Sequence, residues 1–254
     1  MGRAAVAGNA VGLIHPDWPA SANIRAVSTT RAGGVSVGPY ASLNLGSHVG
    51  DDAATVAKNR AIVHDALALA DAPRWLDQVH GVDIVGADAA AFPGSADGAI
   101  TAEVSVVCVV MTADCLPILL CDRGGTHVAA VHGGWRGLAA GVLEAAITAF
   151  VDRGVRPGDL LCWLGPAISQ AAYEVGADVR DALDRDGDAV ALTPNPAGRW
   201  QLDLCALART RLQKSGIEAI YGGGYCTHAD AARFFSHRRD GVCGRQATLI
   251  WRQH

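Results

Sequence analysis

Residues 126–137 read Thr-His-Val-Ala-Ala-Val-His-Gly-Gly-Trp-Arg-Gly, and residues 138–146 continue with Leu-Ala-Ala-Gly-Val-Leu-Glu-Ala-Ala. The apolar run that ends at His132 is typical of a strand, and the glycine pair after it breaks the strand. Helical spacing then predicts one helix that closes at 153–154. Such a turn brings together an imidazole, a flexible backbone and a helix N-terminus, which favours anions. We therefore expect the rest of the fold to be organised around His132.

The composition describes an ordinary globular protein. The chain has 254 residues, of which 50% are hydrophobic and 18% charged, and its formal net charge is −4. This charge provides no field for nucleic acid, so nucleic-acid binding is not expected. No stretch has the length of a signal h-region or a membrane span, and seven scattered cysteines fit a reducing compartment. We therefore expect a cytoplasmic monomer that does not bind membranes.

Strands and helices alternate around glycine-rich loops, without a repeat or a linker. One α/β or α+β domain over 1–254 is the economical prediction, with about 1–20 as a less ordered N-terminal extension. The expected helices follow Asp51 or Asp52, cover 177–183 and run from Asp203 to Gly216. Residues 184–199 are expected to form a surface excursion. The expected strands cover 23–29, two pieces of 76–85 with a bend at His80, 103–111, 118–120, 160–164, 217–221 and 247–251.

Three potential metal ligands stand at predicted strand ends: His80, Cys115 and His132. Two imidazoles and a thiolate suit zinc, and three protein ligands leave a fourth position open, as in catalytic zinc sites. Their separations of 35 and 17 residues are unlike the compact pairs of structural zinc sites. Taken alone, each histidine is as readily explained by packing, so spacing leaves both interpretations open.

Several longer motifs resemble one family. They are Thr-Thr-Arg-Ala-Gly-Gly at 29–34, Leu-Asn-Leu-Gly at 43–46, Gln-Val-His-Gly at 78–81, Thr-Ala-Asp-Cys-Leu-Pro at 112–117, Val-His-Gly-Gly-Trp-Arg-Gly at 131–137, Leu-Gly-Pro-Ala-Ile at 164–168 and Tyr-Glu-Val-Gly at 173–176. In this order they resemble the YfiH or PgeF family, also called the laccase-domain or multicopper polyphenol oxidase family. The family's C-terminal motif reads Ser-Tyr-Arg-Arg-Asp-Gly-Val-Thr-Gly-Arg. Here His237 replaces the tyrosine and Cys243 the threonine, so we assign neither a family role.

The resemblance implies a four-layer α/β/β/α sandwich like that of cytotoxic necrotizing factor. It also implies a zinc site formed by His80, Cys115 and His132. Family members are described as purine nucleoside phosphorylases that act on adenosine, inosine and methylthioadenosine and that also deaminate adenosine. The expected partners are therefore purine nucleosides and phosphate.

Roles for further residues follow as hypotheses. Asp114, beside a ligand, is our candidate for moving protons, although a turn-capping role explains it equally well. Arg31, Arg136 and Arg238 are candidates for phosphate, with amides from Gly133 onward, while a structural salt bridge is the alternative for each arginine. Asn44 and Gln78 lie in family motifs and complete the predicted substrate-binding set. Trp135 or Tyr173 can stack on a purine or simply pack.

Two rival functions remain open. A cysteine hydrolase with Cys115 as nucleophile and His132 as base would suit editing of peptidoglycan precursors of the UDP-MurNAc-L-Ser type. A non-enzymatic metal-binding protein is the other. Four-copper oxidation needs about ten histidines, largely in His-X-His pairs, whereas this chain has nine histidines and no such pair. Copper in the three-ligand site would give at most weak polyphenol oxidation.

Overall fold

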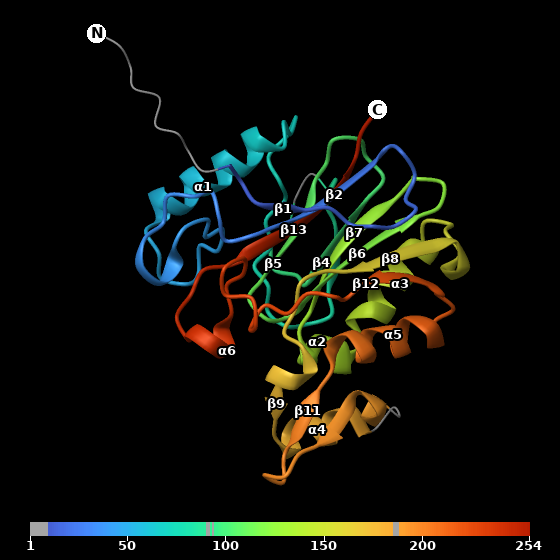
Figure 1. Ribbon diagram of the computed structural model, residues 1–254. Helices are drawn as coiled ribbons and strands as arrows, with labels where there is room; N and C mark the ends of the chain where they lie inside the picture. Colours follow the sequence, from blue (N-terminus) through green and yellow to red (C-terminus); the bar gives the residue numbers. More distant parts are fainter. Residues whose placement is uncertain (1–9, 90–91, 93, 185–187) are drawn as a thin grey trace.

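The computed structural model describes residues 10–89, 92, 94–184 and 188–254. Two β-sheets packed face to face form its centre (Figure 1). The first sheet has the strand order β1-β2-β13-β5 and is antiparallel throughout. Its strands are β1 (Leu13–Ile14), β2 (Ile24–Thr29), β5 (Cys108–Thr112) and β13 (Gln246–Arg252).

The second sheet is mixed, with the order β12-β8-β6-β7-β4-β3. Only its outer pairs, β12 with β8 and β3 with β4, are parallel among the described strands. Its strands are β3 (Ile84–Gly86), β4 (Gly98–Thr101), β6 (Leu116–Asp122), β7 (Val128–Gly133), β8 (Leu160–Leu164) and β12 (Ala219–Gly222). The chain crosses from β5 in the first sheet to β6 in the second through 113–115, which places Cys115 where the two sheets meet.

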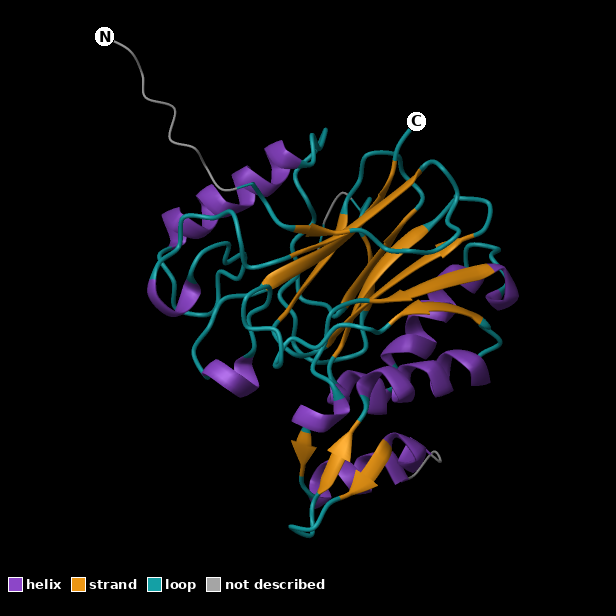
Figure 2. Cartoon of the chain, in the orientation of Figure 1, coloured by secondary structure: helices purple, strands orange, loops and turns teal. Residues whose placement is uncertain are grey.

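Helices cover the outer face of each sheet (Figure 2). The helices on these faces are α1 (Ala53–Ala66), α3 (Val142–Val151) and α5 (Leu204–Lys214); the others are α2 (Trp135–Ala140), α4 (Ala177–Asp184) and α6 (His237–Asp240). Val63 of α1 packs on the first sheet together with Val27 and Leu249. Leu143 and Phe150 of α3 and Leu207 of α5 pack on the second sheet. A third cluster, including Val110 and Leu119, fills the space between the sheets. The predicted α/β/β/α sandwich is confirmed.

A small antiparallel sheet with the order β10-β11-β9 extends beyond the sandwich and carries α4 beside it (Figure 1). Its strands are β9 (Glu174–Val175), β10 (Leu192–Pro194) and β11 (Trp200–Leu202). Residues 184–199, predicted as a surface excursion, include the largely exposed edge strand β10, and 185–187 of this stretch lie outside the described residues. The short 3-10 helices are Gly38–Tyr40, Pro157–Asp159, Gln170–Ala172 and Asp188–Ala191.

Two other local predictions differ from the structure. The single helix predicted after Trp135 is divided in two at Gly141, which has a φ of +103° that other residues rarely adopt. The strand predicted over 103–111 begins at Cys108, and Ser105, with a φ of +70°, interrupts the extended backbone before it. Residues 1–20 were predicted to be a less ordered extension. Within this range, Leu13 and Ile14 form a short strand that pairs with β2, and residues 1–9 lie outside the described part.

Helix starts at Asp52 and Asp203 were predicted correctly because the signal is local. The Asp52 side chain accepts a hydrogen bond from the Thr55 amide, and the Asp203 side chain accepts one from the Ala206 amide. No helix in the described residues is long and apolar enough to cross a membrane.

Candidate metal centre

His80, Cys115 and His132 come together although they are far apart in sequence. Their ligand atoms all lie within 4.8 Å of one another. The Cys115 Sγ is 3.9 Å from the His80 Nε2, and the two imidazole rings meet edge to face with centroids 4.7 Å apart. His132 is on β7, Cys115 directly precedes β6, and these strands pair with Leu116 opposite Gly133. Strand pairing therefore fixes the thiol and one imidazole side by side.

Asp97 orients both histidines. It is fully buried, and its Oδ1 accepts hydrogen bonds from His132 Nδ1 at 2.7 Å and from the His80 amide at 2.9 Å. Its Oδ2 accepts from the amides of Gly81 at 2.6 Å and Val79 at 3.2 Å. Because Nδ1 of His132 donates to the Asp97 carboxylate, Nε2 is the nitrogen left for a metal ion, which would displace the Nε2 proton on binding.

The same carboxylate explains why 76–79 is not the predicted strand. The amides of residues 79–81 turn toward Asp97 instead of toward a neighbouring strand, and His80 adopts a left-handed φ of +61°. Among the described residues of this stretch, Asp77 forms just an isolated bridge with Ser95. The predicted bend at His80 is present, but it presents a ligand instead of joining two strands.

The Cys115 thiol is tuned toward the thiolate. Burial opposes ionisation, but the charge and hydrogen bonds of His132 and His80 lower its pKa to about 6. Burial likewise opposes protonation of His132, but Cys115 and Asp97 raise its pKa to about 9. Burial also opposes ionisation of Asp97, yet hydrogen bonds from His132 and nearby amides lower its pKa. The arrangement supplies one anionic sulfur and oriented imidazole nitrogens, the donor set that zinc prefers.

Gly134 makes room for this cluster. A Cβ at this position would lie 2.8 Å from His80 Cδ2 and 3.4 Å from Cys115 Sγ. We expect Gly134→Ala to displace His80 and to weaken zinc binding by about tenfold or more, while the fold is retained. A chelator-competition titration measures this. Gly224→Ala is the matched control, because a Cβ there meets nothing within 4 Å. Unchanged zinc affinity in Gly134→Ala would contradict this packing argument.

The cluster lies in the wall of a cavity of about 390 Å³ at the end of the sandwich. The helical side of the cavity is aromatic and apolar, and its lining residues include Trp135, Ile168, Tyr173 and Leu204. The opposite side includes His48, Gln78, Met111 and Arg245. Arg136, Arg238 and His237 complete the polar lining. A cavity of this size with a few converging polar groups suits a small organic ligand.

Asp114 lines the cavity beside Cys115, but both of its carboxylate oxygens are engaged. Oδ1 accepts from the Thr227 hydroxyl at 2.7 Å, and Oδ2 accepts from the Arg238 amide at 2.6 Å. It is 8% exposed, with a left-handed φ of +94°. The observed contacts match the turn-capping alternative, and a proton-transfer role would require one of these bonds to open.

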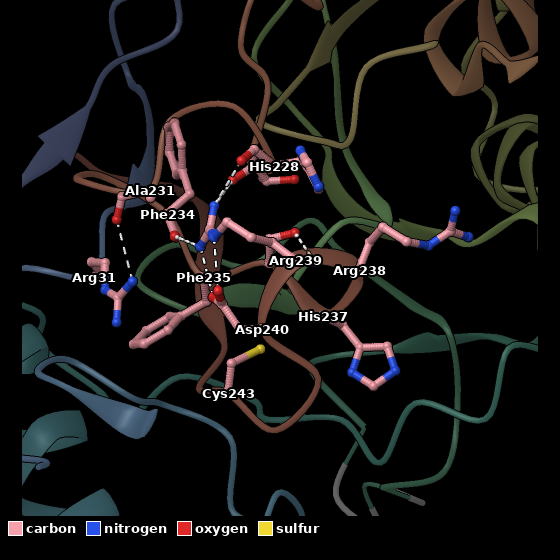
Figure 3. A network of polar contacts seen from close by, with 12 residues as sticks. Arg31, His228, Ala231, Phe234, Phe235, His237, Arg238, Arg239, Asp240 and Cys243 are labelled. Atoms are coloured by element: carbon pink, nitrogen blue, oxygen red, sulfur yellow. Dashed lines mark hydrogen bonds and ion pairs between the residues drawn. The ribbon is translucent and has the colours of Figure 1, made fainter. Parts of the chain in front are cut away.

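The predicted arginines separate into two groups. Arg136 and Arg238 line the cavity, and each guanidinium stacks on a neighbouring aromatic ring, Arg136 on Trp135 and Arg238 on Tyr173. Arg31 lies elsewhere: it donates to the carbonyls of Ala41 and Ala231 and stacks on Phe235. Figure 3 shows Arg31 and Arg238 on opposite sides of the segment that includes α6. The structure therefore does not bring Arg31 to the site, and its contacts explain it as a structural residue.

The side chains of the predicted residues Gln78 and Asn44 bind backbone groups near the site, and Gly133 makes room for a neighbouring side chain. Both amide atoms of Gln78, in the cavity wall, pair with the Met111 backbone, at 2.9 and 2.7 Å. Asn44 is fully buried and accepts hydrogen bonds from the amides of Gly46 and Arg245. Gly133 is the last residue of β7, where a Cβ would lie 2.8 Å from Ile118 Cδ1. Asn44 and Gly133 are outside the cavity lining.

Sequence reasoning missed Asp97, His48, His237 and Arg245. Asp97 precedes β4, and its contacts with His80 and His132 arise through tertiary structure that local sequence does not show. A signal existed for Arg245, because it belongs to the C-terminal Gly-Arg pair of the family motif. His237 lines the cavity although it replaces the family's tyrosine, and its Nδ1 donates to the Gly241 carbonyl.

Comparison with known proteins places the chain in a family. A family model described as multi-copper polyphenol oxidoreductase laccase matches residues 25–253. A purine nucleoside phosphorylase of Pseudomonas aeruginosa is 51% identical over 244 residues, covering 94% of this chain and 98% of the relative. Purine nucleoside phosphorylase YfiH of Escherichia coli is 46% identical over 241 residues, with the same coverage.

Solved structures agree over the whole fold. A Neisseria meningitidis protein described by the family model DUF152 has a TM-score of 0.89 and 46% identity, covering 96% of this chain and 100% of that one. YlmD from Geobacillus stearothermophilus has a TM-score of 0.87 and 33% identity, covering 100% and 98% respectively. The shared sandwich and these nearly full-length similarities show that the chain belongs to the YfiH family of laccase-domain proteins.

Proposed function

We propose that this protein is a zinc-dependent purine nucleoside phosphorylase that acts on adenosine, inosine and methylthioadenosine, with adenosine deaminase activity. The observation that carries the proposal is the His80–Cys115–His132 cluster in a cavity that also has aromatic rings and cations. Relatives named purine nucleoside phosphorylase, at 40–51% identity and covered almost completely, support the reaction class. Purine nucleosides and phosphate are the proposed partners.

The three ligands fit zinc. Tetrahedral coordination with ordinary zinc–sulfur and zinc–nitrogen bonds requires ligand atoms about 3.5 Å apart. The Cys115 Sγ to His80 Nε2 separation of 3.9 Å needs little adjustment. When bound, zinc would supply a Lewis acid beside the substrate and an open coordination position.

The chain's own residues would bind and orient the substrate. Trp135 and Tyr173 offer ring faces to a purine, and their stacked partners Arg136 and Arg238 keep those rings in place. In phosphorolysis a phosphate oxygen attacks C1′ and the C1′–N9 electron pair leaves with the base. The proton of hydrogen phosphate ends on the purine, so the products are a free base and ribose 1-phosphate.

A direct assay tests the proposal. The purified protein is incubated with inosine and inorganic phosphate, and separately with adenosine and inorganic phosphate, while zinc is measured on the same sample. We expect hypoxanthine and ribose 1-phosphate from inosine, adenine and inosine from adenosine, and about one zinc per chain. His80→Ala should lose both zinc and turnover. A wild-type protein that turns over no purine nucleoside would overturn the proposal.

One geometric feature favours the rival cysteine hydrolase. Asp97, His132 and Cys115 form a carboxylate–imidazole–thiol series, with the thiol pKa lowered to about 6. If this is the function, zinc-free protein cleaves a UDP-MurNAc-L-Ser type precursor and iodoacetamide at Cys115 abolishes that cleavage. Loss of activity on zinc removal, with recovery when zinc is restored, excludes this alternative.

The name of the matching family model raises a copper function as well. Within the described residues, His80, Cys115 and His132 are the one group of three or more histidine, cysteine or acidic side chains arranged to hold a metal. Type 1 and trinuclear copper centres together need many more ligands. Weak polyphenol oxidation by copper in this single site is therefore the most that the donor set supports.

A further inference from the structure

The cavity has a second polar side, formed by segments other than those that carry the stacking rings. Its members, Arg245 and His48, belong to segments beside the first sheet, whereas Trp135, Tyr173 and Leu204 come from the helical side of the second sheet. Burial and the positive charges of Arg245, Arg60 and His132 lower the pKa of His48, so at neutral pH it is an uncharged imidazole that can still donate one hydrogen bond. Those acting on Tyr173 are Cys115, Arg238, Asp114 and Arg136. The metal cluster is thus close to both groups of residues, because His132 acts on His48 and Cys115 acts on Tyr173.

Arg245 is fixed by hydrogen bonds from its amide and Nη1, which leave its other guanidinium donors available. Its amide donates to Asn44 Oδ1 at 2.9 Å, and its Nη1 donates to the carbonyls of Cys243 and Gly244, each at 3.0 Å. A Cβ at Gly46 would lie 2.8 Å from Arg245 Cγ, so the glycine makes room for the side chain. Nε and Nη2 have no hydrogen-bond partner in the described part of the chain. A fixed guanidinium with three N–H donors left over, on Nε and Nη2, matches the oxygens of an oxyanion.

The surroundings of Arg245 offer further hydrogen-bonding groups to an anion. His48 is exposed and has no hydrogen bond to any described residue. Thr112, in the same cavity wall, is 2% exposed and has a buried hydroxyl without a partner among the described residues. Asp114 is the one carboxylate among the described residues of the lining, and its oxygens are occupied. By contrast, the guanidinium groups of Arg136 and Arg238 stack on rings.

We propose that Arg245 and His48 form the phosphate subsite, across the metal cluster from the ring faces that hold the purine. This rests on the proposed phosphorolysis and assigns its second substrate to residues outside the predicted set of Arg31, Arg136 and Arg238. Phosphate on this side approaches C1′ from the face opposite the departing base. In this proposal Asn44 fixes the Arg245 backbone and Gly46 leaves room for the Arg245 side chain, so both residues position its guanidinium in the cavity wall.

Steady-state kinetics with inosine and inorganic phosphate test the subsite. Arg245→Gln should raise the KM for phosphate by about tenfold or more, because a charge-assisted pair of hydrogen bonds is lost, and should leave the KM for inosine within about twofold. His48→Ala should raise the phosphate KM in the same direction by a smaller factor. Arg156→Gln, at a position 82% exposed and paired with Asp159, is the matched control and should change neither KM.

Calorimetric titration of the zinc-loaded proteins with inorganic phosphate gives a second readout, and thermal unfolding shows that each variant is folded. If Arg245→Gln fails to fold, His48→Ala decides. An unchanged KM for phosphate in folded Arg245→Gln would contradict the proposed subsite. If that variant does not fold, an unchanged KM for phosphate in His48→Ala would contradict it. A selective rise in Arg136→Gln or Arg238→Gln would instead place phosphate on the aromatic side. A wild-type protein without phosphate-dependent cleavage contradicts the proposed function itself, so the two failures are distinguishable.

Discussion

Cys115→Ser is expected to purify with little zinc and without phosphorolysis. Serine preserves the volume and the turn between β5 and β6, but its hydroxyl is neutral at pH 7 and is a poor zinc ligand. The loss of a direct ligand should weaken zinc binding more than the 10–100-fold typical of residues that support a ligand, so we expect roughly 100-fold or more. Elemental analysis and the inosine assay measure the two effects together.

Cys226→Ser provides the matched control for this substitution. Cys226 is half-buried, its thiol donates a hydrogen bond to the Ser169 hydroxyl, and it is outside the cavity lining. It should keep both zinc and activity. Full zinc content in a folded Cys115→Ser protein would show that the thiol is not a ligand. Retained zinc without turnover would instead favour the cysteine nucleophile of the hydrolase alternative.

Asp97→Asn should have the second-largest effect, although Asp97 is not itself a predicted ligand. The carboxylate accepts four hydrogen bonds, from His132 Nδ1 and from three amides of residues 79–81. An amide of the same shape has one accepting oxygen and removes the negative charge that orients His132. We expect zinc affinity to fall by about 10–100-fold. Stability should fall by about 1–3 kcal/mol, because buried donors lose their acceptor.

Two measurements distinguish positioning from a general loss of structure. Competition with a chelator gives the zinc affinity, and the visible spectrum of the cobalt-substituted protein reports the ligand geometry. Asp83→Asn, at an exposed neighbouring position, is the matched control and should change neither. A cobalt spectrum and zinc affinity equal to wild type in Asp97→Asn would mean that Asp97 is not needed to orient the histidines.

The sequence was sufficient to predict elements whose signals lie within a few neighbouring residues. The cap residues Asp52 and Asp203 and the buried run of β8 identified elements directly. His80, Cys115 and His132 could be selected because each stands beside a glycine, a strand break or both. The prediction that these three residues come together depended on the family resemblance, because spacings of 35 and 17 residues carry no geometric information. Strand pairing between β6 and β7 supplies the missing contact.

The supporting residues could not be identified in this way. Arg31 and Arg245 look alike in sequence, each being an arginine beside a glycine-containing loop. Tertiary contacts direct Arg31 to the Ala41 and Ala231 carbonyls and place Arg245 in the cavity wall. Asn44 was predicted to bind substrate because it lies in a family motif, yet its contacts hold the Arg245 amide instead. A motif thus marks a residue near function without showing whether it contacts the ligand.

The proposed phosphorolysis depends on the His80–Cys115–His132 cluster acting as a zinc site. The most direct measurement is the formation of ribose 1-phosphate from inosine and inorganic phosphate, followed against bound zinc as a chelator removes the metal stepwise. Turnover is expected to fall in proportion to bound zinc and to return when zinc is restored. Undiminished phosphorolysis by protein that contains no bound metal would contradict this dependence.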